Sequence, residues 1–224
     1  MRFQDAARDA RAVVYAGIQA DPLVAHAGEL LADADSAQRV LARAVMNGET
    51  IDPDGWRATF PSLFGPTTGP IERARSEAIL AASLAVAERG EQVRSQVRGA
   101  IVEELTARLL ARRVGPAGVR RERRILFDGV RAEIHPYDVT VERAAAPEAY
   151  DCKWGARGIN ADVLHQLDDA RIHAADEDER LTVALVVFDA ARSCAVRLAA
   201  QTAPHDGTAI VTIETLDELA EPSA

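Results

Sequence analysis

Lysine is almost missing from this sequence. Of its 26 basic residues, 25 are arginine, and the single lysine is Lys153. Only two cysteines occur, Cys152 and Cys194, so the sequence excludes a disulfide framework and favours a reducing cytoplasm over secretion. Aromatic residues account for 4% of the chain, which predicts a core filled mainly with Ala, Val, Leu and Ile.

Long apolar segments are missing too. No apolar run approaches the roughly 18 residues of a membrane span, and the charged first residues lack the apolar stretch of a signal peptide. The sequence contains no phosphate-binding glycine loop, no dinucleotide-binding fingerprint and no Cys/His cluster with zinc spacing. These absences predict a cytoplasmic protein that makes no membrane contact and carries no motif of the nucleotide- or zinc-binding classes.

Negative charge dominates the chain but is unevenly distributed. The net charge is −9, which on its own argues against a nucleic-acid partner. Between Glu91 and Arg157, however, 13 Arg or Lys outnumber 10 Asp or Glu, so this segment is locally basic. Within it, Arg121, Arg123 and Arg124 are candidate contacts for nucleic-acid phosphates. A solvated basic hairpin is the alternative interpretation of the same residues.

The first 90 residues carry helical patterns. Apolar residues over 4–47 recur at helical spacing and predict two helices, broken at Asp21-Pro22. The glycine- and proline-rich residues 48–70 predict a loop, and a helix is expected from Pro70 to about Arg89. We interpret residues 1–90 as a helical N-terminal region for target recognition, homodimer formation or binding of a partner protein.

Residues 91–220 predict an α/β domain. A helix is expected over 92–114, ended by Gly115-Pro116, and strand patterns follow on both sides of the turn signal Asp128-Gly129. The later predicted elements are a strand at 149–153, a helix over about 160–175 and strands at 181–188 and 208–214. This order predicts an α/β sandwich with a mixed central sheet and a right-handed crossover through the last helix.

Two carboxylates and the only lysine lie within this domain. Asp138 ends one predicted strand, and Asp151 and Lys153 lie on the next. Because strand side chains alternate between faces, Asp151 and Lys153 share a face that Asp138 can join. Paired carboxylates suit Mg²⁺, and a lysine can orient water or stabilise charge on an attacked phosphate. An ordinary salt bridge between strand ends is the alternative interpretation.

The same residues resemble a known nuclease signature. Pro136-Tyr137-Asp138 followed by Asp151-Cys152-Lys153 resembles the P-D…(D/E)-x-K pattern of the restriction-endonuclease-like nucleases, with Tyr137 as an additional residue. The run from Gly99 to Glu103 is similar to the G-x-x-x-E run of Mrr-like enzymes and archaeal Holliday-junction resolvases. Gln166 resembles the glutamine that follows the motif in Mrr-like and RecB-like members. The resemblance covers roughly residues 92–190.

The resemblance implies a restriction-endonuclease-like αβββαβ core and a Mg²⁺-dependent DNA endonuclease of a defence, restriction or repair system, with Mn²⁺ as a substitute ion. It implies metal ligation by Asp138, Asp151 and Glu103, and catalytic roles for Lys153 and Gln166. Glu104 is the alternative to Glu103, because it adjoins the apolar stripe of that helix. Arg157, on the loop after the lysine, is a further candidate phosphate contact. A catalytically silent scaffold of this fold, binding nucleic acid or a protein, is the alternative function.

Overall fold

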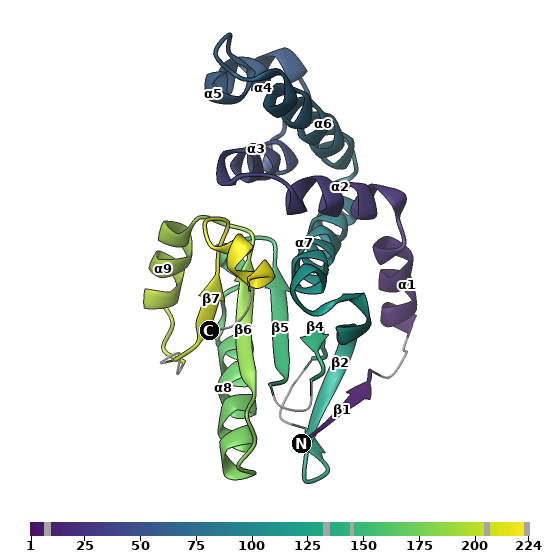
Figure 1. The fold of residues 1–224 in the computed structure, drawn as a ribbon, viewed down its shortest axis with the longest axis vertical. Coiled ribbons are helices and arrows are strands. Elements are labelled where there is room, and N and C mark those ends of the chain that lie inside the picture. Colours follow the sequence, from purple (N-terminus) through teal and green to yellow (C-terminus); the bar gives the residue numbers. More distant parts are fainter. Residues whose placement is uncertain (7–9, 132–134, 144–145, 204–206, 222–224) are drawn as a thin grey trace. The chain divides into compact units, whose positions relative to one another are not determined.

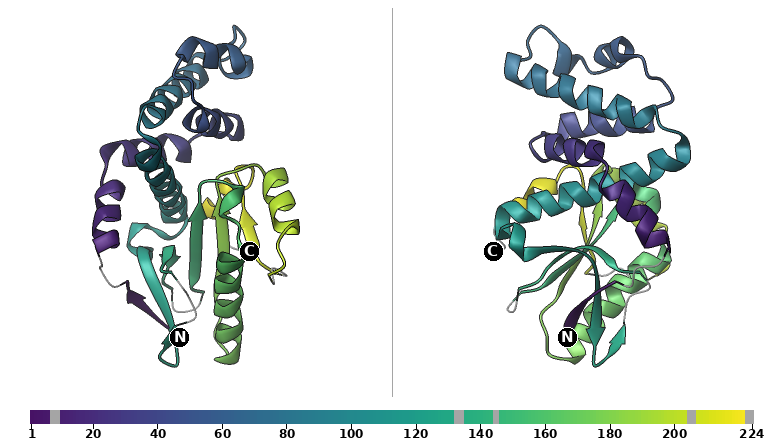
Figure 2. Two further views of the ribbon diagram at one scale, coloured as in Figure 1. Left: turned by 180° about the vertical axis from the view of Figure 1, so that it is seen from behind. Right: turned by 90° about the vertical axis from the view of Figure 1, so that its right-hand side faces the viewer.

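The computed structural model describes residues 1–6, 10–131, 135–143, 146–203 and 207–221 (Figures 1 and 2). These residues form two compact units, which we call the helical unit (Ala10–Leu105) and the sheet unit (Met1–Asp9 with Thr106–Ala224). The sequence placed a boundary at residue 90, whereas this division lies within helix α7 (Glu91–Val114). None of the helices in the described ranges has both the length and the apolar character needed to cross a membrane.

The helical unit contains more helices than the sequence predicted. The predicted break at Asp21-Pro22 is confirmed, since Asp21 caps a helix by accepting a hydrogen bond of 2.9 Å from Leu23 N. Asp35 caps another helix: its side chain accepts a hydrogen bond from Gln38 N, and the side chain of Gln38 accepts one from Asp35 N. The segment predicted as two helices therefore contains three. The helices before α7 are α1 (Ala10–Gln19), α2 (Pro22–Ala32), α3 (Ser36–Asn47), α4 (Pro53–Thr59), α5 (Pro61–Phe64) and α6 (Pro70–Ala87).

Two short helices occupy the segment predicted as a loop. Both α4 and α5 have proline at their first turn, where its missing amide costs no helical hydrogen bond. The helix predicted to start at Pro70 is confirmed as α6. In α7, the predicted apolar stripe is fully buried and consists of Val97, Ile101, Leu105 and Leu109.

The sheet unit is built around a mixed sheet with the strand order β1-β2-β4-β5-β6-β7, and β3 also pairs with β2. Neighbouring strands from β1 to β5 are antiparallel, whereas β5, β6 and β7 are parallel to one another. The strands are β1 (Arg2–Asp5), β2 (Val119–Phe127), β3 (Val130–Arg131), β4 (Tyr137–Val141), β5 (Glu148–Lys153), β6 (Thr182–Val187) and β7 (Ala209–Val211). Its later helices are α8 (Ala161–Asp176) and α9 (Ala191–Ala199), with short 3-10 turns η1 (Pro116–Gly118), η2 (Ala156–Gly158) and η3 (Leu216–Ala220).

The chain has the predicted α/β fold with a mixed sheet, but in the described part of the chain four strands (β2 to β5), and not three, lie between α7 and α8. The predicted turn joins β2 to β3, and Asp128 and Gly129 have φ values of 45° and 83°, as this tight hairpin requires. The strand pattern predicted after this turn is divided into β3 and β4, and residues 132–134 lie outside the described part of the chain. The helix expected from residue 4 was wrong there, because residues Arg2–Asp5 form β1.

The two faces of the sheet contact different helices. Cys152 Sγ on β5 lies 3.5 Å from Thr106 Oγ1, and Glu148 pairs with Arg113, so these β5 side chains point to the C-terminal part of α7. Ala149 belongs instead to the core cluster that includes Leu164 and other residues of α8. Because side chains alternate along a strand, Asp151 and Lys153 lie on the face that α8 covers.

Candidate active site

Asp138 and Asp151 lie next to each other on adjacent strands. Val139 pairs with Tyr150 in the antiparallel β4–β5 ladder, and continuing this register by one residue brings Asp138 opposite Asp151. Directly opposed residues of an antiparallel pair point to the same face of the sheet. Asp138 Oδ2 also accepts a hydrogen bond of 2.6 Å from the backbone amide of Cys152, which ties it to β5. The structure therefore brings the two predicted carboxylates together.

Lys153 joins these carboxylates. Its ammonium group pairs with Asp151, whose side chain is only 6% exposed, while the lysine side chain is 28% exposed. Burial lowers the pKa of Lys153, but the negative charges of Asp151 and Asp138 outweigh it, so the pKa is raised above its ordinary value. Lys153 is therefore protonated at neutral pH. It can donate hydrogen bonds and stabilise negative charge, but it cannot act as a base.

A glycine supports the aliphatic part of Lys153. A Cβ atom at Gly158, in the turn η2, would lie 2.7 Å from both Cβ and Cγ of the lysine, too close for two carbon atoms. The buried carboxylate of Asp189 holds this turn, because Asp189 Oδ2 accepts a hydrogen bond of 3.0 Å from Ala156 N. Gly158 and Asp189 were not predicted as site residues from the sequence. The two glycines in Gly155-Ala156-Arg157-Gly158 were the available signal of a close backbone approach.

The substitution Gly158→Ala tests this support. The added methyl group has to displace the lysine stem, which we expect to lower the rate of any reaction that needs Lys153 by roughly 10- to 100-fold. Overpacking of this kind also destabilises a fold by about 1–3 kcal/mol. Single-turnover rates and thermal unfolding would be compared with those of Gly90→Ala, where the new methyl meets nothing within 4 Å. Equal rates for both variants would contradict a positioning role of Gly158.

Gln166 on α8 holds the segment that leads into β4. Its Nε2 donates a hydrogen bond of 3.1 Å to His135 O, and its Oε1 accepts one of 3.0 Å from His135 N. The side chain is buried, so water competes little for these bonds. A catalytic role was predicted for Gln166 from the sequence. In the structure its hydrogen bonds fix the backbone three residues before Asp138, which indicates a positioning role.

Glu103 is engaged within the helical unit. It is buried, and its carboxylate accepts hydrogen bonds from the hydroxyl of Tyr15 and, at 2.8 Å, from Gln19 Nε2. Gly99, one turn earlier on α7, leaves room for Tyr15, since a Cβ there would lie 3.3 Å from the Tyr15 hydroxyl oxygen. The Gly-x-x-x-Glu run thus packs α1 against α7 in this unit. The alternative residue, Glu104, packs at Gly28 of α2.

A divalent ion would depend on two protein carboxylates here. Across the residues that the structure describes, no cluster of three or more His, Cys, Asp or Glu side chains could hold a metal ion. Asp138 and Asp151 nevertheless fit Mg²⁺, which often binds through one or two carboxylates and fills its remaining positions with water and substrate phosphate. One hydrogen bond or ion pair does not exhaust the acceptor capacity of a carboxylate.

The predicted phosphate-binding arginines are placed differently from one another. Arg123 forms ion pairs with Asp5 and Glu142, and the hydrogen bond that it donates to Glu142 raises its pKa despite partial burial. These carboxylates neutralise its charge locally, so Arg123 is the least suited of the four predicted arginines to bind a phosphate. Arg157 is exposed in η2, four residues after the lysine. Arg124 lies opposite Gln4 in the β1–β2 ladder, and Arg121 lines a cavity beside α7.

No protein-family model, curated protein or solved structure matches this chain. Its function is therefore inferred from the geometry and chemistry of its own residues.

Proposed function

We propose that this chain is a metal-dependent nuclease that hydrolyses phosphodiester bonds in DNA, with a restriction-endonuclease-like core within its sheet unit. The observation that carries the proposal is the grouping of Asp138 and Asp151 with the chain's only lysine on one face of the sheet. In a chain that uses arginine for all its other basic side chains, a lysine between two carboxylates indicates a need for a compact ammonium group.

Each residue then has a defined role. Asp138 and Asp151 hold Mg²⁺, which supplies Lewis acidity and lowers the pKa of a bound water. The ammonium group of Lys153 donates hydrogen bonds to the attacking water or to the phosphate oxygens, where negative charge develops. Gln166 fixes the backbone before Asp138, and Gly158 and Asp189 fix the turn against Lys153. By the family resemblance, the products carry 5′-phosphates.

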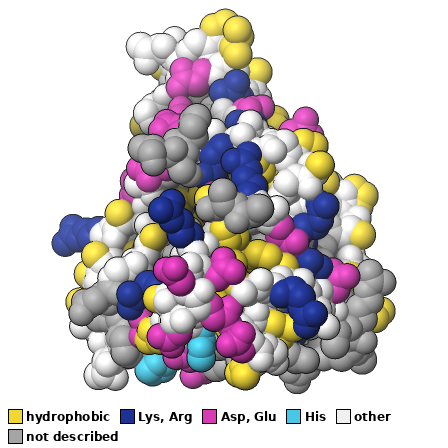
Figure 3. Space-filling view, turned by 60° about the horizontal axis from the view of Figure 1, so that its bottom comes forward, with side chains coloured by type: hydrophobic (Ala, Val, Ile, Leu, Met, Phe, Trp, Pro, Cys, Tyr) yellow, Lys and Arg dark blue, Asp and Glu magenta, His cyan; other side chains and the backbone are white. Residues whose placement is uncertain are grey.

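DNA remains the expected substrate despite the net charge of −9. On the face drawn in Figure 3, Asp and Glu side chains are interspersed with Arg and Lys, without one continuous basic surface. We expect a few focused contacts with DNA phosphates, with Arg157 beside the site as a candidate. Residues 1–90 would add target recognition, a homodimer contact or a partner protein.

The proposal is tested by metal-dependent cleavage. Purified protein with Mg²⁺ or Mn²⁺ is expected to cut duplex, single-stranded or branched DNA, and chelation by EDTA should stop the reaction. Titration calorimetry should detect Mg²⁺ binding that Asp138→Asn and Asp151→Asn each abolish. The exposed Asp162 on α8 offers a matched control, because Asp162→Asn should leave both cleavage and binding unchanged.

Two outcomes separate the proposal from its alternative. If none of the three DNA forms is cut and Mg²⁺ gives no heat that depends on these aspartates, the chain is not a metal-dependent nuclease. Binding of DNA or of a protein without cleavage and without that heat would instead indicate a catalytically silent scaffold of the same fold.

A further inference from the structure

Lys153 pairs with a carboxylate that the proposed function assigns to a metal ion. Its ammonium group contacts Asp151, and Asp138, which lies opposite Asp151 in the β4–β5 register, adds its negative charge to the attraction. A cation beside two neighbouring carboxylates reduces their mutual repulsion, which is also an effect of a bound divalent ion. In the metal-free protein, Lys153 therefore takes the electrostatic part of that ion.

The approach to Asp151 is narrow. The side chain of Asp151 is only 6% exposed, whereas that of Lys153 is 28% exposed, so the lysine is the more accessible member of the pair. An ion that binds the Asp151 carboxylate has to enter through this small exposed surface, where the ammonium group already lies. Two cations beside one partly buried carboxylate repel each other more strongly than they would in water. Mg²⁺ and the ammonium group therefore compete for Asp151.

The lysine can leave Asp151 without leaving the site. Gly158 in the turn η2 lies against the stem of Lys153, since a Cβ atom on the glycine would come within 2.7, 2.7 and 2.9 Å of the lysine Cβ, Cγ and Cδ. Asp189 holds this turn through Ala156 N. The contact favours rotation about the last bonds of the side chain over movement of its whole stem. A released ammonium group therefore stays close to the carboxylates.

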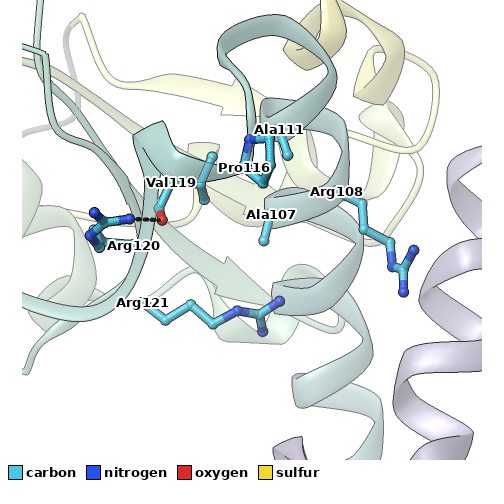
Figure 4. Close-up of a pocket in the computed structure, with 7 residues that line it drawn as sticks. All are labelled: Ala107, Arg108, Ala111, Pro116, Val119, Arg120 and Arg121. Atoms are coloured by element: carbon cyan, nitrogen blue, oxygen red, sulfur yellow. Dashed lines mark hydrogen bonds between the residues drawn. The ribbon is translucent and has the colours of Figure 1, made fainter.

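The arginines of the cavity beside α7 lie apart from this exchange. Arg121 pairs with Val139, which in turn pairs with Tyr150, so Arg121 lies on the α7 face of the sheet. Figure 4 shows the guanidinium groups of Arg108 and Arg121 pointing apart at that cavity. Asp151 lies on the opposite face, which α8 covers. The exchange at Asp151 is therefore between Lys153 and an ion from solvent.

We infer that Lys153 is a metal-gated donor: it pairs with Asp151 in the metal-free protein and is released from this carboxylate when Mg²⁺ binds. This role rests on the proposed function, because it takes Asp138 and Asp151 as the metal ligands. Once released, the ammonium group can donate hydrogen bonds to a substrate phosphate or to the attacking water. Without the metal, its pairing with Asp151 withholds it from the substrate.

The presence of a single lysine makes its release directly measurable by NMR. Protein produced with lysine labelled by ¹³C at Cε and ¹⁵N at Nζ gives side-chain signals from Lys153 alone. The position of the Cε–Hε signal reports a change of surroundings. Ammonium protons of a paired lysine exchange slowly with water and give a ¹H–¹⁵N signal, whereas release speeds this exchange and removes the signal.

The full chain without DNA would be titrated with MgCl₂ by NMR and by calorimetry under the same conditions, starting from EDTA-treated protein. We expect the Cε–Hε signal to shift and the ammonium signal to disappear over the Mg²⁺ concentrations at which calorimetry detects binding. NaCl at matched ionic strength is the control for simple screening of the ion pair, and it should keep the ammonium signal.

Three variants identify the groups involved. Asp151→Asn removes the ion pair, so it should lack the ammonium signal even without Mg²⁺ and should not respond to the ion. Asp162→Asn, on the exposed surface of α8, should behave like the wild type. Lys153→Met has no ammonium group to displace and should bind Mg²⁺ up to about fivefold more tightly than the wild type. Because the wild-type titration needs no variant, a variant that fails to fold does not prevent the test.

The outcomes that would overturn this role are distinct from failure of the proposed function. If Mg²⁺ binds through Asp138 and Asp151 while the ammonium signal persists, the lysine and the ion bind side by side, so the gating is wrong and the metal site stands. An ammonium signal already missing in EDTA would contradict the pair itself. If Mg²⁺ gives neither heat nor a change in the spectrum, the gated lysine and the metal-dependent nuclease both fail.

Discussion

Lys153→Met is expected to lower the rate of DNA cleavage by roughly 10²- to 10³-fold, the usual cost of removing one donor that stabilises a transition state. Methionine keeps an unbranched apolar stem beside Gly158 and removes only the ammonium group that pairs with Asp151. Binding of Mg²⁺ should be retained or strengthened, since Asp151 loses a competing cation. Single-turnover cleavage and titration calorimetry with Mg²⁺ measure the two quantities separately.

The variant Lys153→Arg provides the chemical control. It keeps the positive charge, but the planar guanidinium is larger than an ammonium group and presents its donors in a different geometry. We expect a rate between those of the wild type and Lys153→Met. Arg192→Met, which removes an exposed cation on α9, should leave the rate unchanged. Wild-type cleavage by Lys153→Met would show that the lysine has no part in the chemistry.

The pH dependence of stability in the metal-free protein has a defined sign. The neighbouring carboxylates raise the pKa of Lys153 above its ordinary value of 10.5, against the effect of burial. Its attraction to Asp151 therefore stabilises the fold fully below the pKa of the unfolded chain and is lost as pH rises through the folded value. Urea unfolding of the wild type in EDTA should accordingly show no alkaline loss of stability caused by Lys153 below pH 10.5.

Local sequence patterns were sufficient to predict α7, the hairpin that follows it, and then β5, α8, β6 and β7. Asn160 could be identified as a cap because its side chain accepts a hydrogen bond from Val163 N, three residues later. Asp128-Gly129 could be identified as a hairpin because both residues tolerate positive φ. The common face of Asp151 and Lys153 follows from the two-residue period of any strand. All of these interactions lie within a few residues of the chain.

Interactions between distant segments could not be predicted in this way. Strand β1 has no strand pattern of its own and is defined by its pairing with β2, in which Phe3 lies opposite Ile125. The helix α9 was not predicted either, and most of its side chains are exposed. Asp189 supports the turn after Lys153 through Ala156, 33 residues away in the sequence. The hydrogen bonds of Glu103 with α1 likewise depend on how distant helices pack.

Removal of Glu148 is expected to have the largest effect on stability. Its carboxylate on β5 pairs with Arg113 on α7, and both side chains are only 9% exposed. The hydroxyl of Tyr150 also donates to Glu148. Burial lowers the pKa of Arg113, but Glu148 raises it more, so the arginine stays charged inside the protein. The variant Glu148→Ala leaves this charge buried without its carboxylate, which should destabilise the sheet unit by about 3–5 kcal/mol.

The free energy of unfolding should be measured for the sheet unit alone, because two compact units do not have to unfold together. Trp154, which stacks on Phe188 at 5.1 Å, reports on this unit once Trp56 of the helical unit is replaced by phenylalanine. Urea unfolding in this background would compare Glu148→Ala with the double variant Arg113→Leu/Glu148→Leu. The double variant removes both charges and should be closer to the wild type, since apolar residues often replace a buried ion pair at little cost. An exposed ion pair contributes at most about 1 kcal/mol to the free energy of unfolding. If Glu148→Ala lowers this free energy by less than that, a buried ion pair between α7 and β5 would be contradicted.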